Sequence, residues 1–131
     1  MITEDYVSFE VAKLLKEKGF FKDVDLRMIQ NLSFYDNIGL SHNLNKWYDS
    51  LIQDKIDFVV APTHQMAMKW LREEKRTSII IEFDVTKRGY CPYVHQLDYD
   101  MDWVVKWRIN IPMKYEEAVE VALKYTLENL I

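Results

Sequence analysis

The feature that most constrains the fold is a run of three short apolar segments in the second half of the chain. Residues 78–83 (SIIIEF), 90–97 and 103–111 (WVVKWRINI) are rich in β-branched and aromatic residues and predict strands. Only short connections separate them, with turn residues at 87–89 and an acidic turn at 98–102. Because a parallel crossover needs about a dozen residues or more, strands this close together predict an antiparallel meander.

Pro92 and two tryptophans make this prediction more specific. Proline has no backbone N–H to donate to a neighbouring strand, so Pro92 predicts an edge position or an irregular start for the second strand. Trp103 and Trp107 are an even number of residues apart, so a regular strand would place them on the same face. An exposed aromatic face of this kind would mark a partner surface or a dimer interface.

Two amphipathic segments flank the predicted meander. Residues 61–73 have Pro62 in the expected first helical turn and an apolar face made of Met66, Ala67, Trp70 and Leu71. The segment from about residue 115 to the end predicts a second helix, whose apolar face consists of Ala118, Val119, Ala122, Leu123, Thr126, Leu127 and Leu130. Helices before and after a meander can cover one face of its sheet, so we predict an α-β-β-β-α arrangement in the C-terminal half.

The N-terminal half predicts a helix and an extended pair. Ser8 and Gly19 bracket the helix as its N-cap and C-terminal cap, with a start at Thr3 as the alternative. Residues 24–36 predict extended chain followed by a turn at 36–39, and residues 56–60 predict a short strand. Residues 43–53, with Asn43 as a candidate cap, fit both a helix and an ordered loop. The fold class predicted for the chain is therefore α+β.

Size and composition favour a single domain over residues 1–131. A chain of this length can bury a core of its own without a disulfide or a metal. Cys91 is the only cysteine, so no intrachain disulfide can form and a reducing compartment is expected. No apolar stretch approaches about 18 residues, and the acidic N-terminus lacks the pattern of a signal peptide, so we expect no membrane partner.

The net charge of −4 gives the chain as a whole no attraction for nucleic acid or anionic lipid. Residues 61–91 are the exception, with 6 basic against 4 acidic residues. Their cations would form one nucleic-acid patch if the middle helix ended beside the first hairpin turn: Lys69, Arg72, Lys75, Arg76, Lys87 and Arg88. The α-β-β-β-α order is also superficially similar to double-stranded RNA-binding modules. A solvated helix end is the simpler interpretation of the same charges.

The single cysteine has a histidine four residues after it, a spacing that supplies half of a zinc site or a thiol–imidazole pair. A structural zinc site normally has two such pairs, and only one is present. Pro92 follows Cys91 and removes the next backbone donor that a nucleophilic site with His95 would use. We therefore expect Cys91 and His95 to be neither metal ligands nor catalytic residues.

Two acidic clusters are equally incomplete as sites. Asp98, Asp100 and Asp102 begin like a calcium loop, but Trp103 and Ile109 stand where that loop needs glycine and glutamate. A second cluster at the start of the last helix consists of Glu116, Glu117 and Glu120, whose charges suit the positive end of the helix dipole. We expect an acidic turn and a favourable helix start, with no catalytic residue, no cofactor and no metal.

Three segments together resemble a group of uncharacterised small proteins from gut Bacteroidales and the bacteriophages that infect them. The segments are residues 6–20 (YVSFEVAKLLKEKGF), 61–73 (APTHQMAMKWLRE) and 115–131 (YEEAVEVALKYTLENLI), about a third of the chain. The resemblance implies a phage or mobile-element setting and a bacterial cytoplasm. It implies no activity and transfers no catalytic residue, because the three segments are helices with ordinary apolar faces.

The sequence therefore favours a small non-catalytic protein that binds another protein, or a second copy of itself, through a surface that includes Trp103 and Trp107. The alternative is a weak nucleic-acid-binding module that uses the basic residues between 69 and 90. A third hypothesis is an enzyme with an unrecognised site, for which Cys91 and His95 are the first residues to test.

Overall fold

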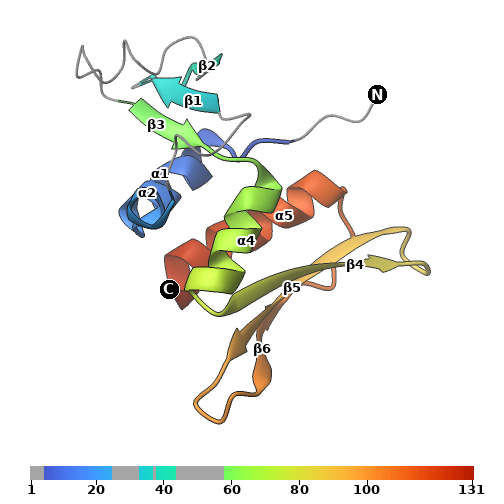
Figure 1. Cartoon of the computed structure of the whole chain (residues 1–131). Coiled ribbons are helices and arrows are strands. Elements are labelled where there is room, and N and C mark those ends of the chain that lie inside the picture. Colours follow the sequence, from blue (N-terminus) through green and yellow to red (C-terminus); the bar gives the residue numbers. More distant parts are fainter. Residues whose placement is uncertain (1–4, 25–32, 37, 44–57) are drawn as a thin grey trace. The chain divides into compact units, whose positions relative to one another are not determined.

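The computed structural model describes residues 5–24, 33–36, 38–43 and 58–131 (Figure 1). Along the chain these residues form α1 (Phe9–Glu17), α2 (Phe20–Asp23), β1 (Ser33–Asp36), β2 (Ser41–Asn43), β3 (Phe58–Ala61), α4 (His64–Glu74), β4 (Thr77–Asp84), β5 (Gly89–Leu97), β6 (Trp103–Arg108), α5 (Tyr115–Tyr125) and the π-helical turn η2 (Thr126–Leu130). The chain divides into an N-terminal unit, Met1–Met66, and a C-terminal unit, Ala67–Ile131. Helices and antiparallel strands occur in separate stretches, which confirms the predicted α+β class, whereas one domain over residues 1–131 stays a prediction.

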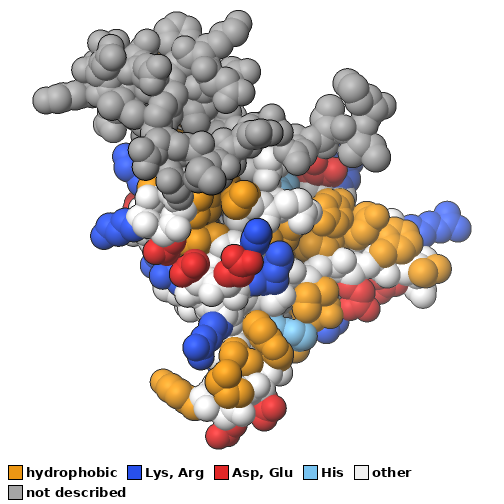
Figure 2. All heavy atoms as spheres, in the orientation of Figure 1, with side chains coloured by type: hydrophobic (Ala, Val, Ile, Leu, Met, Phe, Trp, Pro, Cys, Tyr) orange, Lys and Arg blue, Asp and Glu red, His pale blue; other side chains and the backbone are white. Residues whose placement is uncertain are grey.

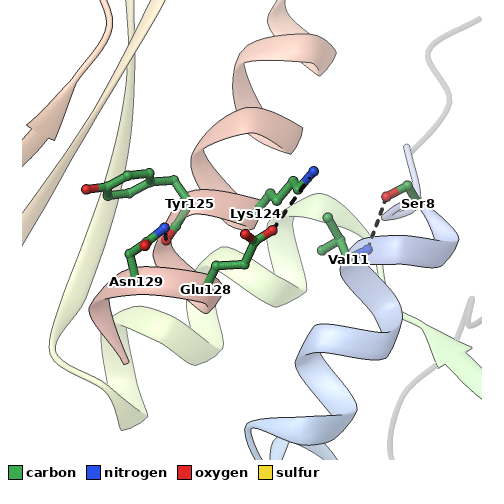
Figure 3. A network of polar contacts seen from close by, with 6 residues as sticks. All are labelled: Ser8, Val11, Lys124, Tyr125, Glu128 and Asn129. Carbon is green, nitrogen blue, oxygen red and sulfur yellow. Dashed lines mark hydrogen bonds and ion pairs between the residues drawn. The ribbon is translucent and has the colours of Figure 1, made fainter.

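Helix α1 begins where its predicted cap places it. The Ser8 hydroxyl accepts the N–H of Val11 at 3.2 Å, as Figure 3 shows, and the chain after the helix turns at Gly19 with φ of 92°. The alternative start at Thr3 is wrong, because Tyr6 and Val7 are not helical. Tyr6 instead forms a β-bridge with Thr63, and the Val7 N–H donates to the Pro62 carbonyl at 3.0 Å.

Replacing Ser8 with alanine leaves the first-turn N–H groups of α1 without their side-chain acceptor. We expect the Ser8→Ala variant to lose about 1 kcal/mol of unfolding free energy, the usual cost of removing such a cap. Urea denaturation followed by circular dichroism measures this loss. Ser8→Asp is the matched control, because its carboxylate can accept the same N–H and favours the positive end of the helix. Equal losses in the two variants would show that the cap contributes nothing.

Strands β1, β2 and β3 form an antiparallel sheet in the order β2-β1-β3. The predicted turn is present between β1 and β2, where the Asp36 carboxylate accepts the N–H groups of Ile38 and Leu40 at 3.0 and 2.9 Å. The predicted strand at 56–60 is found as β3. Asn43 is the last residue of β2, and both its role as a cap and the choice between helix and loop for the residues after it lie outside what the structure describes.

The C-terminal unit contains the predicted meander in the order β4-β5-β6, with α5 packed on β4 and β5 (Figure 1). Helix α4 starts later than predicted. Its first residue is His64, and the Thr63 hydroxyl accepts the Met66 N–H at 3.2 Å, so Pro62 precedes the helix instead of lying in its first turn. Met68, rather than Met66, is buried beside Ala67, Trp70 and Leu71.

The end of α5 is held by local polar contacts. Lys124 and Glu128 form an ion pair of 3.9 Å one helical turn apart, and the Asn129 amide donates to the Tyr125 carbonyl at 3.2 Å (Figure 3). The predicted apolar face of this helix is buried from Ala118 to Leu127. Among the described residues, no helix has the length and apolar character needed to cross a membrane.

The edge position predicted from Pro92 is wrong, because β5 is the central strand. The Pro92 carbonyl accepts the N–H of Ile109 at 3.0 Å, on the side of β5 where β6 lies. The N–H and C=O of one strand residue point to the same side, so the N–H that proline lacks would face this side too. Strand β6 ends at Arg108, so the N–H that proline lacks would face Ile109, the first residue after β6.

The prediction that Trp103 and Trp107 share a face is also wrong, because β6 contains a bulge. Val94 pairs with Trp107 and the next residue, His95, pairs with Val105, which leaves Lys106 as an extra residue. A bulge of one residue reverses the alternation of faces on either side of it. Trp107 lies on the face covered by α5, where it stacks on Tyr125 with ring centroids 4.7 Å apart. Trp103 lies on the opposite face.

Candidate functional sites

A basic hollow of about 340 Å³ lies at the end of the β4–β5 hairpin. Its lining comes from the end of β4, the hairpin turn and the segment before α5: Phe83, Lys87, Arg88, Gly89, Tyr90, Pro112, Met113 and Lys114. Three of these side chains are cations and none is acidic. Figure 2 shows basic side chains at the tip of this hairpin, beyond a band of hydrophobic ones.

The hollow exists because the hairpin is joined to the segment before α5. Tyr90 and Met113 exchange both backbone hydrogen bonds, at 2.9 and 3.0 Å. Gly89 permits this approach, since a Cβ atom on it would lie 2.6 Å from the Cβ of Pro112. Tyr90 is further held by edge-on ring contacts with Phe83 at 5.0 Å and Tyr115 at 5.3 Å.

Of the cations of the basic hollow, Lys87 is held by the turn and by the chain opposite it. The Lys87 ammonium donates to the Asn110 carbonyl at 2.7 Å, and an ammonium group has two further donors. The Lys87 backbone N–H donates to the Asp84 carboxylate at 3.0 Å. Arg88 is exposed and has φ of 56°, in the left-handed region.

The structure separates the six cations that the sequence grouped as one patch. Lys87 and Arg88 follow β4, whereas Lys75 and Arg76 precede it, and eight strand residues span roughly 25 Å. Lys75 instead lies over the ring of Trp70 at 5.4 Å. Lys69 and Arg72 are exposed on α4 and do not line the hollow. Whether any of the six binds nucleic acid stays a prediction.

Lys114 was missed by sequence reasoning. It stands 26 residues after Arg88, and only the Tyr90–Met113 pairing brings it to the hollow. Gly89 was the one hint in the sequence of this close approach, because a glycine in a strand often marks a site where another backbone comes near.

A second candidate surface is the exposed apolar segment, which we define as Tyr99, Met101, Trp103, Val104 and Val105. Trp103 is 50% exposed and Val105 is 47% exposed, although they lie in a strand. Strand β6 is an edge of the described sheet, with β5 as its neighbour on one side. Acidic residues precede the strand part of this segment, and basic residues follow it: Asp98, Asp100 and Asp102 before Trp103, then Lys106 and Arg108 after Val105.

The face of the β4-β5-β6 sheet opposite α5 continues this surface. His95 lies between the rings of Tyr93 and Trp103, at 5.0 and 6.5 Å. The Arg108 guanidinium lies 4.4 Å from the Tyr93 ring and 3.9 Å from the Glu82 carboxylate. Of the two tryptophans predicted to face a partner, Trp103 is therefore on this surface and Trp107 is not.

The incomplete catalytic and metal patterns do not become sites in the described part of the chain. Cys91 and His95 lie four residues apart on β5, roughly 13 Å, which is too far for a hydrogen-bonded pair. No three His, Cys, Asp or Glu side chains of the described residues are grouped to hold a metal ion. The Asp98 carboxylate accepts the N–H groups of Asp100 and Asp102, both at 2.9 Å, so its role is to stabilise the turn.

Comparison with protein-family models, with curated proteins and with solved structures found no match to this chain.

Proposed function

We propose that this protein is a non-catalytic protein-interaction protein that assembles with a second copy of itself through β6. The observation that carries the proposal is the exposed apolar segment on an edge strand. An edge strand exposes backbone N–H and C=O groups, and here it does so together with apolar side chains from Trp103 to Val105, before the bulge at Lys106. Burying this segment between two copies would stabilise the assembly, because it removes apolar surface from water.

The charges around β6 favour a second copy as the occupant. In an antiparallel pair related by a two-fold axis, the start of one β6 lies beside the end of the other. The acidic residues 98–102 of one copy would then meet Lys106 and Arg108 of its partner, and the same contacts would recur at the other end. The β4-β5-β6 sheets of the two copies would join into one continuous sheet, with the exposed apolar segments of both copies at its centre.

The first test introduces a charge at the proposed interface. We expect Val105→Lys to weaken the dimer roughly 30-fold, for about 2 kcal/mol of lost apolar burial. Sedimentation equilibrium over a range of protein concentrations measures the dissociation constant. Val121→Lys is the matched control, because Val121 is a 37% exposed valine on α5. A wild-type chain that stays monomeric, or equal weakening by both variants, would contradict the proposal.

The second test uses the predicted charge complementarity. Lys106→Glu and Asp102→Lys should each weaken self-association several-fold, because each places like charges at both ends of the symmetric interface. A mixture of the two variants should form a heterodimer of near wild-type affinity at low salt, and this recovery should diminish at high salt. The amount of heterodimer is measured by mixing a tagged variant with an untagged one and capturing the tagged chain. A mixture no tighter than either variant alone would exclude antiparallel pairing of β6.

The setting we propose is the bacterial cytoplasm, in a phage or mobile-element context. The support is the resemblance of the three helical segments to proteins of gut Bacteroidales and their bacteriophages. A reducing compartment also suits a chain whose only cysteine, Cys91, is buried and unpaired.

A further inference from the structure

We infer that the basic hollow binds the phosphate of a nucleotide unit, with the Phe83 ring stacking on its base. The nucleotide unit comes either free or as part of a single-stranded nucleic acid. This inference is independent of self-association, because the hollow is at the β4–β5 hairpin and the proposed interface is on β6. Of the six cations in the predicted nucleic-acid patch, Lys87 and Arg88 line this hollow, and Lys114 joins them there.

Three cations around one hollow are suited to a phosphate. Lys87, Arg88 and Lys114 contribute their charges from two separate parts of the chain. A guanidinium can donate two parallel hydrogen bonds to phosphate oxygens, and ammonium groups add point charges. The acidic residues nearest to them in sequence are Asp84, Glu116 and Glu117, and none of these three lines the hollow.

The aromatic part of the hollow favours a nucleotide over a simple anion. Phe83 is 51% exposed although its ring contacts Tyr90 at 5.0 Å, so an apolar ring stands at the hollow with much of its surface in water. Bases stack on such rings without sequence preference, beside cations that contact the backbone phosphates. The volume of about 340 Å³ is at the lower end of the range of small-ligand sites.

Three described residues other than glycine have a positive φ, namely Arg76, Arg88 and Met101, and Arg88 is the one among them that lines the hollow. Its φ of 56° lies in the region that glycine and asparagine adopt most readily, so an arginine there lowers the stability of the turn. A residue that is unfavourable for the local backbone is a reason to look for a role of its side chain in binding. Arg88 is exposed, and the hollow is the site that its side chain lines.

The experiment measures binding of a fluorescently labelled single-stranded oligothymidylate and of thymidine monophosphate to the full chain at low salt. We expect Arg88→Asn to weaken binding about tenfold while the variant is at least as stable to urea as the wild type. Opposite changes in binding and stability would not result from a merely structural arginine. Lys114→Gln should weaken binding similarly, and Lys69→Gln, an exposed cation on α4 outside the hollow, should leave it unchanged.

Phe83→Leu tests the stacking, since leucine keeps the apolar contact with Tyr90 and removes the aromatic ring. We expect it to weaken binding of both probes about tenfold. Thymidine should bind far more weakly than its monophosphate. If only the oligonucleotide binds, the ligand is a single-stranded nucleic acid. If thymidine monophosphate binds as well, a free nucleotide is sufficient. Either result supports the inference.

Several outcomes would overturn the inference. One is the absence of binding by both probes. Another is equal weakening by Lys69→Gln and Arg88→Asn, which would indicate diffuse charge attraction. A third is equal affinity for an acidic peptide and the oligonucleotide. Val105→Lys should bind both probes like the wild type, so failure here and failure of the self-association proposal are distinguishable.

Discussion

Replacement of Leu123 by alanine is expected to lower the unfolding free energy by about 2–5 kcal/mol. Leu123 lies on α5 and is completely buried, in the part of the helix that packs on β4 and β5. Alanine removes three carbon atoms from this core and leaves a cavity that the neighbouring strands can close only in part. Urea denaturation measures this loss of unfolding free energy. The dependence of the unfolding free energy on urea concentration should be the same for the variant and the wild type.

Val121 provides the control for this prediction. It is two residues away on the same helix and 37% exposed, so Val121→Ala removes little buried surface and places a better helix former on α5. We expect a change of less than about 0.5 kcal/mol. A Leu123→Ala variant as stable as Val121→Ala would mean that α5 does not form the core of the C-terminal unit.

Replacement of Gly89 by alanine is expected to cost about 1–3 kcal/mol through crowding. The added Cβ would lie 2.6 Å from the Pro112 side chain and 3.2 Å from the Met113 nitrogen. Because Met113 is the backbone partner of Tyr90, the two segments must separate for the methyl group to fit. The basic hollow should open with them, so the variant should also lose affinity for the phosphate probes.

Gly19→Ala is the informative comparison, because its cost has a different origin. An added Cβ at Gly19 meets no atom within 4 Å, but the φ of 92° is strained for any residue with a side chain. We expect this variant to lose about 1 kcal/mol and to bind the phosphate probes normally. Thermal unfolding and probe binding, measured on both variants, separate the two effects. Unchanged probe binding by Gly89→Ala would show that the close approach is not needed for the site.

Local patterns were sufficient to predict most of the secondary structure of the described residues. The caps at Ser8 and Gly19, the strands of the meander and the apolar face of α5 each depend on residues within a few positions of one another. Antiparallel pairing followed from the short connections, because a parallel crossover could not fit in them. The acidic turn at 98–102 was recognisable for the same reason, since its carboxylate binds the backbone two and four residues away.

The mistaken predictions share a cause that is not local. The sequence of a strand does not show which neighbouring strand faces a proline that lacks its N–H. Pro92 fits the central strand because β6 ends at Arg108, and this end is seen only in the paired sheet. Likewise, the bulge at Lys106 depends on pairing with β5, and it decides that Trp103 is exposed while Trp107 is stacked under α5. The alternative start of α1 at Thr3 failed for a similar reason, because Tyr6 pairs with a residue 57 positions away.

The sequence by itself determined the fold class, the strand order of the meander and the absence of a complete catalytic motif, because these depend on periodicity, spacing and residue type. Only the tertiary structure decided where function is to be sought. It placed Lys114 at the same hollow as Lys87 and Arg88, divided the predicted basic patch, and left Trp103 exposed on the face of the sheet opposite α5. The physical reason is that a binding surface is made by backbone pairing between distant segments, and that pairing depends on the whole chain rather than on any short stretch of it.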